Sequence, residues 1–179
     1  MTTILFSKKN LLSYSKYLCL ILACELEQPP DMNIKLSILH DQRQIPLVGK
    51  TVSYLCVLCE VGEHPSVKNI ELAIVELLNN IIVHGGGDCQ SEIEVHCEFK
   101  GQEFAVSVTD NCRALSPEHV SAYTDKEVSM PSLDTGIDLL PEGGWGIQLI
   151  KSVCDQVFYT RFDQRNIYKL TFDLSVVEL

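Results

Sequence analysis

The chain has 179 residues and a formal net charge of −10 at pH 7. This length allows one domain with a full hydrophobic core. The acidic balance, without any run of lysine or arginine, argues against a protein that binds a nucleic-acid backbone.

Eight cysteines are scattered along the chain, without the spacing of a disulfide framework. Cys56 and Cys59 form one CxxC within an apolar helical pattern, and no second pair completes a zinc site. We therefore expect buried thiols in a reducing cytosol, and a cytoplasmic protein that binds neither nucleic acid nor membrane.

The first 31 residues differ in texture from the rest. Lys8 and Lys9 precede an apolar stretch that ends at Cys24, an order found in secretory signals. Lys16 and two serines shorten the uninterrupted apolar run to about eight residues, which is short for a signal core or a bilayer span. We expect residues 1–31 to be an N-terminal extension or a mis-assigned start, and residues 32–179 to form the domain.

A strand and two helices are predicted in the first half of the domain. Residues 34–39 alternate as a strand does, and residues 45–61 carry a helical apolar stripe that ends at Gly62. Ser66 suits the N-cap of the next helix, which continues through the very apolar residues 71–84 and stops at three glycines.

Three polar residues interrupt the apolar stretch 71–84. Glu76, Asn80 and His84 follow one another at i, i+4 spacing and therefore lie along one side of the helix. Burying a carboxylate and a carboxamide costs free energy unless something polar faces them. They either satisfy each other and nearby backbone or face a ligand, and spacing alone favours the first alternative.

Two hairpins and a short helix are predicted in the second half. Residues 91–99 and 103–110 form the first hairpin, which places Asp110 at a strand end, where binding clefts are commonly built. Residues 116–125 resemble a short helix, with Ser116 as its N-cap. Residues 156–162 and 166–174 form the second hairpin.

A loop and a glycine-rich turn separate that short helix from the second hairpin. Residues 126–140 lose periodicity, which is typical of a mobile loop that closes over a ligand. Residues 141–146, PEGGWG, then lead directly into a helical pattern. Free N–H groups at such a helix start suit phosphate oxygens, although many glycine-rich turns are only tight bends.

Three motifs in this order carry a resemblance to a known superfamily. They are ELAIVELLNNIIVH, VSVTDN and GGWGIQLIKSVCDQVFYTR, and the resemblance covers residues 33–174. The chain resembles the ATP-binding superfamily of gyrases, heat-shock chaperones, mismatch-repair ATPases and sensor histidine kinases. Within it, the chain is most similar to single-domain anti-sigma factors, the serine-protein kinases of bacterial partner-switching systems.

The resemblance implies a histidine-kinase-like ATPase (Bergerat) fold and a Mg·ATP site. The fold is an α/β (α+β) two-layer sandwich, with a mostly antiparallel sheet covered on one face by helices. Asn80 resembles the Mg²⁺ ligand, Glu76 the general base, and Asp110 the carboxylate that accepts a hydrogen bond from the adenine amino group. The residues similar to the family's phosphate-binding segment are Gly143, Gly144, Trp145, Gly146 and Ile147.

One segment departs from the family pattern. Cys112 and Ala114 stand where glycines usually follow the adenine-binding aspartate. If the backbone there needs a positive φ, each of the two costs about 1 kcal/mol, which would weaken nucleotide binding.

The implied function is an Mg·ATP-dependent serine/threonine protein kinase that is also an anti-sigma factor. It would phosphorylate a small antagonist (anti-anti-sigma) protein and so control which partner binds the sigma factor, and the family habit suggests a homodimer. The alternative is a module, with or without bound nucleotide, that regulates by sequestering a partner. A detached sensor-kinase domain is disfavoured, because that class needs a phosphoacceptor histidine in a helical dimerisation segment. The N-terminal extension has no histidine before His40.

Overall fold

The computed structural model describes residues 2–5, 32–59, 66–85, 92–124 and 145–175. Six strands form one sheet in the order β1-β2-β3-β4-β6-β5. Only β1 pairs in parallel, with β2, whereas every other neighbouring pair is antiparallel. The strands are β1 (Thr2–Leu5), β2 (Met32–Ile38), β3 (Ile93–Lys100), β4 (Glu103–Asp110), β5 (Gln156–Phe162) and β6 (Arg165–Asp173).

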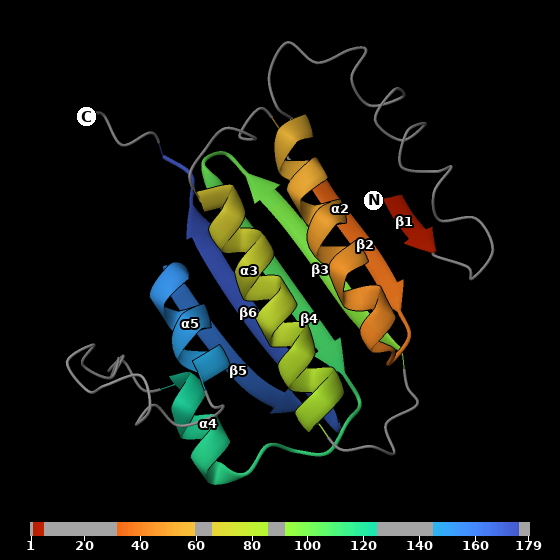
Figure 1. The fold of residues 1–179 in the computed structure, drawn as a ribbon, viewed down its shortest axis with the longest axis vertical. Coiled ribbons are helices and arrows are strands. Elements are labelled where there is room, and N and C mark those ends of the chain that lie inside the picture. The colour runs from red at the N-terminus through yellow and green to blue at the C-terminus, as the bar shows by residue number, and fades with distance from the viewer. Residues whose placement is uncertain (1, 6–31, 60–65, 86–91, 125–144, 176–179) are drawn as a thin grey trace, which may run out of the picture.

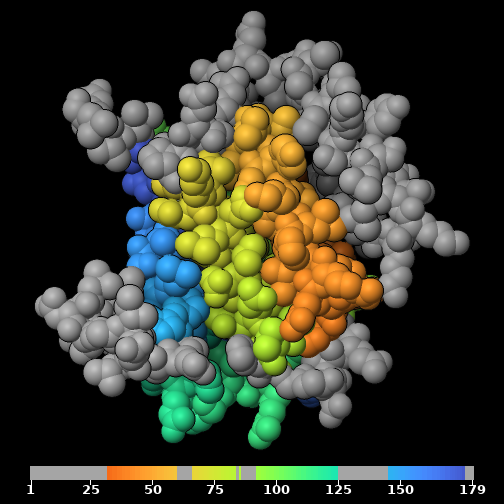
Figure 2. Space-filling model, viewed as in Figure 1, coloured from red at the N-terminus to blue at the C-terminus, as the bar shows by residue number. Residues whose placement is uncertain are grey.

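Three helices cover one face of this sheet (Figure 1). They are α2 (Ile45–Leu58), α3 (Ser66–Asn79) and α5 (Trp145–Val153), with α3 between the other two. The space-filling view shows them packed side by side over the sheet (Figure 2). The short helix α4 (Pro117–Thr124) lies at one end of this layer, and a 3-10 turn, η1 (Gln42–Gln44), precedes α2. The predicted two-layer sandwich with a mostly antiparallel sheet is therefore confirmed.

The strands are amphipathic, because successive side chains point to opposite faces of a sheet. In β3, residues 93, 95, 97 and 99 are buried under the helices, whereas the residues between them are half-buried or exposed. The same alternation in β2 and β4 places Leu36 and Val106 in one core with Val95 of β3 and the helices. On the second face of the sheet, β3 carries only polar residues: Glu94, His96, Glu98 and Lys100.

The central helix α3 follows the predicted apolar period. It buries Val67, Ile70, Ala73, Ile74, Leu77 and Leu78 against the sheet and its neighbouring helices. The prediction of one continuous helix to residue 84 is wrong in detail, because α3 ends at Asn79. A π-helical turn, η2 (Asn80–His84), follows it, and the Gly85 N–H closes the turn on the Ile81 carbonyl at 3.0 Å.

Both predicted hairpins are confirmed, with β3 paired to β4 and β5 paired to β6. The turn of the second hairpin uses Asp163 and Gln164, whose φ angles are 47° and 64°. Two successive positive φ angles match the right-handed twist of the flanking strands. This turn fixes the register of β5 against β6, which places Arg161 opposite Asn166.

The N-terminal residues remain a matter of prediction. Thr2–Leu5 pair with β2 at the edge of the sheet, and residues 6–31 lie outside the described residues. The division at residue 31 is therefore still a prediction. Among the helices of the described ranges, none is long and apolar enough to cross a bilayer.

The prediction of buried thiols is correct for three described cysteines, whereas Cys154 is only half-buried and Cys112 is not a free thiol. Cys56, Cys59, Cys97 and Cys154 are free, and burial raises the pKa of Cys56 to about 12 and of Cys59 to about 11. Cys112, in contrast, is disulfide-bonded. Such high pKa values fit buried structural thiols rather than reactive ones.

Candidate functional site

Asp110 is the most buried charged residue of the described chain, with 1% of its surface exposed. It is the last residue of β4 and points to the helix-covered side. Its Oδ1 accepts hydrogen bonds from the Cys112 N–H at 2.7 Å and from Asn166 Nδ2 at 2.8 Å. Its Oδ2 is buried and has no partner. A buried acceptor without a donor is costly, and it suits a ligand that brings one.

Asn166 is the residue directly opposite Asp110 on β6. Its Oδ1 accepts from the Tyr159 hydroxyl at 2.9 Å and from Arg161 Nη1 at 2.6 Å. Arg161 Nη1 also donates to the Cys112 carbonyl at 3.1 Å. A polar network therefore runs from the edge strand β5 through β6 to Asp110.

The protonation of Asp110 reflects two opposing influences. Burial raises the pKa of Asp110 above its ordinary value, because the carboxylate loses its hydration. The hydrogen bonds from Asn166 and the Cys112 N–H lower it, as do the charges of Arg161 and His40. The burial effect prevails, so this carboxyl group is held in an unfavourable environment.

A wall of three tyrosines lies beside Asp110. Tyr123 of α4 stacks with Tyr159 at a centroid distance of 6.2 Å and contacts Tyr168 edge-on at 5.5 Å. Burial raises the pKa of Tyr123 to about 12, and the charge of Asp110 contributes to this rise. The Tyr123 hydroxyl also accepts a hydrogen bond from Asn80 Nδ2 at 3.3 Å. Tyr123 therefore links the surroundings of Asp110 to the π-helical turn that follows α3.

Glu76 and Asn80 meet the start of α5. A Cβ atom built on Gly146 would lie 3.1 Å from Glu76 Oε2 and 3.1 Å from Asn80 Oδ1. The predicted i, i+4 pair on one side of the helix is thus confirmed, and both side chains are directed at the second residue of α5. Any larger residue at 146 would force these two polar groups to move.

The N-terminus of α5 presents backbone N–H groups at this point. The first four N–H groups of a helix have no partner within it and carry partial positive charge. Trp145, Gly146 and Ile147 are half-buried in this first turn. Gly143, Gly144 and the predicted loop 126–140 lie outside the described residues, and so does the side chain of His84.

These residues fit a magnesium nucleotide. Asn80 supplies a neutral amide oxygen beside the carboxylate of Glu76, and Mg²⁺ takes few protein oxygens when phosphates complete its shell. In the part of the chain that the structure describes, no cluster of three His, Cys, Asp or Glu side chains forms a separate metal site. The open Oδ2 of Asp110 is an acceptor suited to an amino group.

The departure from the family pattern at Cys112 and Ala114 carries no backbone strain. Among the described non-glycine residues, a positive φ occurs only at Asp163 and Gln164. The expected cost of about 1 kcal/mol at each position therefore does not apply. The Cys112 backbone instead supports the site, because its N–H and carbonyl bind Asp110 and Arg161.

Tyr123, Asn166 and Arg161 are functional-site residues that the sequence patterns did not indicate. Asn166 could have been found by pairing the strand that ends at Asp110 with the last strand, but this requires knowing that β4 and β6 are neighbours. Tyr123 and Arg161 carry no signal in the sequence. Both are placed by tertiary packing alone.

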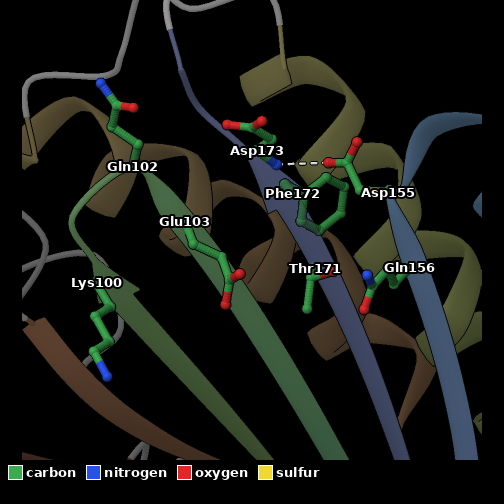
Figure 3. Close-up of a pocket in the computed structure, with 8 residues that line it drawn as sticks. All are labelled: Lys100, Gln102, Glu103, Asp155, Gln156, Thr171, Phe172 and Asp173. Carbon is green, nitrogen blue, oxygen red and sulfur yellow. Dashed lines mark hydrogen bonds between the residues drawn. The ribbon is translucent and has the colours of Figure 1, made fainter.

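A shallow depression of about 440 Å³ lies at the other end of the sheet (Figure 3). It is lined by Lys100, Gln102, Glu103, Asp155, Gln156, Thr171, Phe172 and Asp173. Glu103 begins β4 and Asp110 ends it, so this depression is separate from the residues around Asp110. None of its lining residues is a buried charged side chain like Asp110.

The ends of α3 and β4, the helix α4 and the start of α5 lie together at one end of the sheet (Figure 1). We call this end the polar corner, because it holds the buried Asp110 together with Glu76 and Asn80. The chain belongs to the histidine kinase-like ATPase domain family, whose model matches residues 41–172 of the 179. A comparison with curated proteins found no match. The predicted superfamily is therefore confirmed, and family membership indicates ATP binding.

Proposed function

We propose that this protein is an ATP-binding anti-sigma factor of a bacterial partner-switching system, active in the cytoplasm. In this proposal it is a serine/threonine protein kinase whose substrate is a small antagonist protein. The observation that carries the proposal is the convergence of Glu76 and Asn80 on Gly146 at the start of α5. The resemblance of the three motifs to single-domain anti-sigma kinases supports the finer assignment.

Each site residue has a distinct role in this proposal. Asp110 Oδ2 accepts a hydrogen bond from the adenine amino group. The N-terminal N–H groups of α5 bind phosphate oxygens, and Asn80 Oδ1 holds Mg²⁺. When bound, Mg²⁺ neutralises charge on the phosphates.

Glu76 is proposed as the general base. It takes the proton from the serine or threonine hydroxyl of the antagonist as the new oxygen–phosphorus bond forms and the bond to ADP breaks. The carboxylate is half-buried and adjacent to the start of α5, where the phosphates would bind. Positioning and charge neutralisation supply the rest of the catalysis.

The experiment compares phosphotransfer by Glu76→Gln and Glu71→Gln proteins. Each is incubated with γ-labelled Mg·ATP and the small antagonist proteins of the same cell. Glu71 is a matched control on the same helix, because it pairs with Lys50 at 2.7 Å and lies away from Gly146. We expect Glu76→Gln to bind ATP as the wild type does. Its rate of phosphate transfer should be lower by about 100-fold or more. Glu71→Gln should transfer at the wild-type rate.

Two results would contradict the proposal. Phosphotransfer at the normal rate by Glu76→Gln would exclude Glu76 as the base. ATP binding without transfer to any antagonist, together with intact partner binding, would favour a module that regulates by sequestration alone.

A further inference from the structure

Arg161 makes an unusual set of contacts for an exposed arginine on an edge strand. Four ion pairs join described residues, and Arg161 takes part in none of them. Its Nη1 instead donates to Asn166 Oδ1 at 2.6 Å and to the Cys112 carbonyl at 3.1 Å. The guanidinium therefore serves the network around Asp110 without touching that carboxylate directly.

These contacts fix the orientation of the Asn166 amide. With donors from both Tyr159 and Arg161 on Oδ1, the amide nitrogen must face the other way. It then donates to Asp110 Oδ1 at 2.8 Å and to the Arg113 carbonyl at 3.1 Å. A flipped amide would direct its oxygen at the carboxylate and its N–H groups at the guanidinium, and both contacts would be repulsive.

The fixed amide leaves one carboxylate oxygen open. Asp110 Oδ1 already accepts two hydrogen bonds, from Asn166 and from the Cys112 N–H, whereas Oδ2 accepts none. An exocyclic amino group, such as N6 of adenine, can donate to this oxygen. The O6 oxygen of guanine is an acceptor and would be repelled by it.

We propose that Arg161 is a positioning residue for base selection, which acts through Asn166 to hold Asp110 Oδ2 open for an aminopurine and against an oxopurine. This inference rests on the proposed nucleotide site and deepens it. It assigns discrimination between ATP and GTP to a residue that acts through its hydrogen bond to Asn166.

The charged and titratable groups that face Asp110 allow a second measurement, the pH dependence of ATP binding. Arg161 approaches from β5 and His40 from the segment after β2, while Tyr123 and Tyr168 approach from α4 and β6. Removal of the Arg161 charge should raise the pKa of Asp110 further, because that charge favours the ionised form. If binding needs the carboxylate, binding will be lost at a higher pH in the variant. His40 is present in both proteins and does not affect the comparison.

The experiment measures the dissociation constants of Mg·ATP and Mg·GTP for the full chain from mildly acidic to mildly alkaline pH. The variants are Arg161→Met, which removes the charge and the donor, and Arg161→Lys, which keeps the charge. Lys169→Ala is the matched control, because it removes one exposed positive charge from the same hairpin. Thermal unfolding confirms that each protein is folded.

We expect Arg161→Met to bind ATP about tenfold more weakly, as for one lost hydrogen bond. The ratio of its GTP and ATP dissociation constants should fall by the same factor, because GTP binding is not expected to change. The pH below which ATP binding is lost should be higher in Arg161→Met than in the wild type. Arg161→Lys should restore part of each change. Lys169→Ala should resemble the wild type. Tyr159→Phe removes the second donor to Asn166 and should reduce the preference in the same direction.

An unchanged preference for ATP over GTP in Arg161→Met would overturn this inference while leaving the proposed function intact. Equal losses in Arg161→Met and Lys169→Ala would also overturn it, because they would show a general charge effect. A wild-type chain that binds no ATP would refute the proposed function and this inference together.

Discussion

Asp110 is the most buried charged side chain in the described part of the protein. It is almost fully buried, one of its oxygens has no partner, and burial raises its pKa. A buried acceptor without a donor costs free energy, and functional sites are one place where native proteins retain such groups. The carboxylate is therefore expected to reduce the stability of the free protein and to contribute to nucleotide binding.

The first prediction concerns the stability of Asp110→Asn. An acid whose pKa is raised in the folded state makes the protein less stable as pH rises from the unfolded pKa through the folded one. The asparagine variant does not ionise, so it should gain stability relative to wild type at neutral pH. This gain should shrink as the solution is made acidic. Thermal unfolding at several pH values measures it, and a gain that grows toward acidic pH would contradict the assigned pKa direction.

At the residue scale, the sequence alone could indicate a site residue only where its position follows from the local helical or strand period. Glu76 and Asn80 could be paired because the helical period places them on one side, and Asp110 could be placed because it ends an alternating strand. Asn166 and Arg161 depend on the neighbouring strand and its register, which are long-range properties. Their roles could not be read from local patterns.

At the element scale, the change from α3 to the π-helical turn occurs at Asn80. Such turns are rare and are frequently found at functional sites. The apolar pattern of residues 81–83 is the same for either helix type, so the sequence predicted a continuous α-helix. The turn instead gives Asn80 its place between Tyr123 and Gly146.

Gly146 supplies the prediction that belongs to α5. In Gly146→Ala, the new methyl group would crowd Glu76 and Asn80, and Mg·ATP affinity should fall at least about tenfold. The thermal midpoint should change little, because the helix preference for alanine over glycine, at most about 1 kcal/mol, is offset by the crowding of Glu76 and Asn80. Ser152→Ala, an exposed position on the same helix, is the control for both measurements. Unchanged ATP affinity in Gly146→Ala would show that the start of α5 is not part of the site.

At the scale of the whole molecule, the fold brings its chemistry to one end of the sheet. The end of β4, the end of α3, α4 and the start of α5 meet there, although they are distant in sequence (Figure 1). The sequence predicted the layers and both hairpins because strand alternation and helical periodicity are local. It did not predict the order of the strands or the parallel pairing of β1, which depend on packing across the sheet.

The most direct measurement is calorimetric titration of Mg·ATP into the wild-type chain and into Asp110→Asn. A nucleotide site at this corner predicts micromolar binding by the wild type, about −8 kcal/mol. It predicts no measurable binding by Asp110→Asn, whose fold is tested independently by its stability. The absence of binding by the wild type, or equal binding by both proteins, would contradict the central claim that this corner of the fold binds ATP.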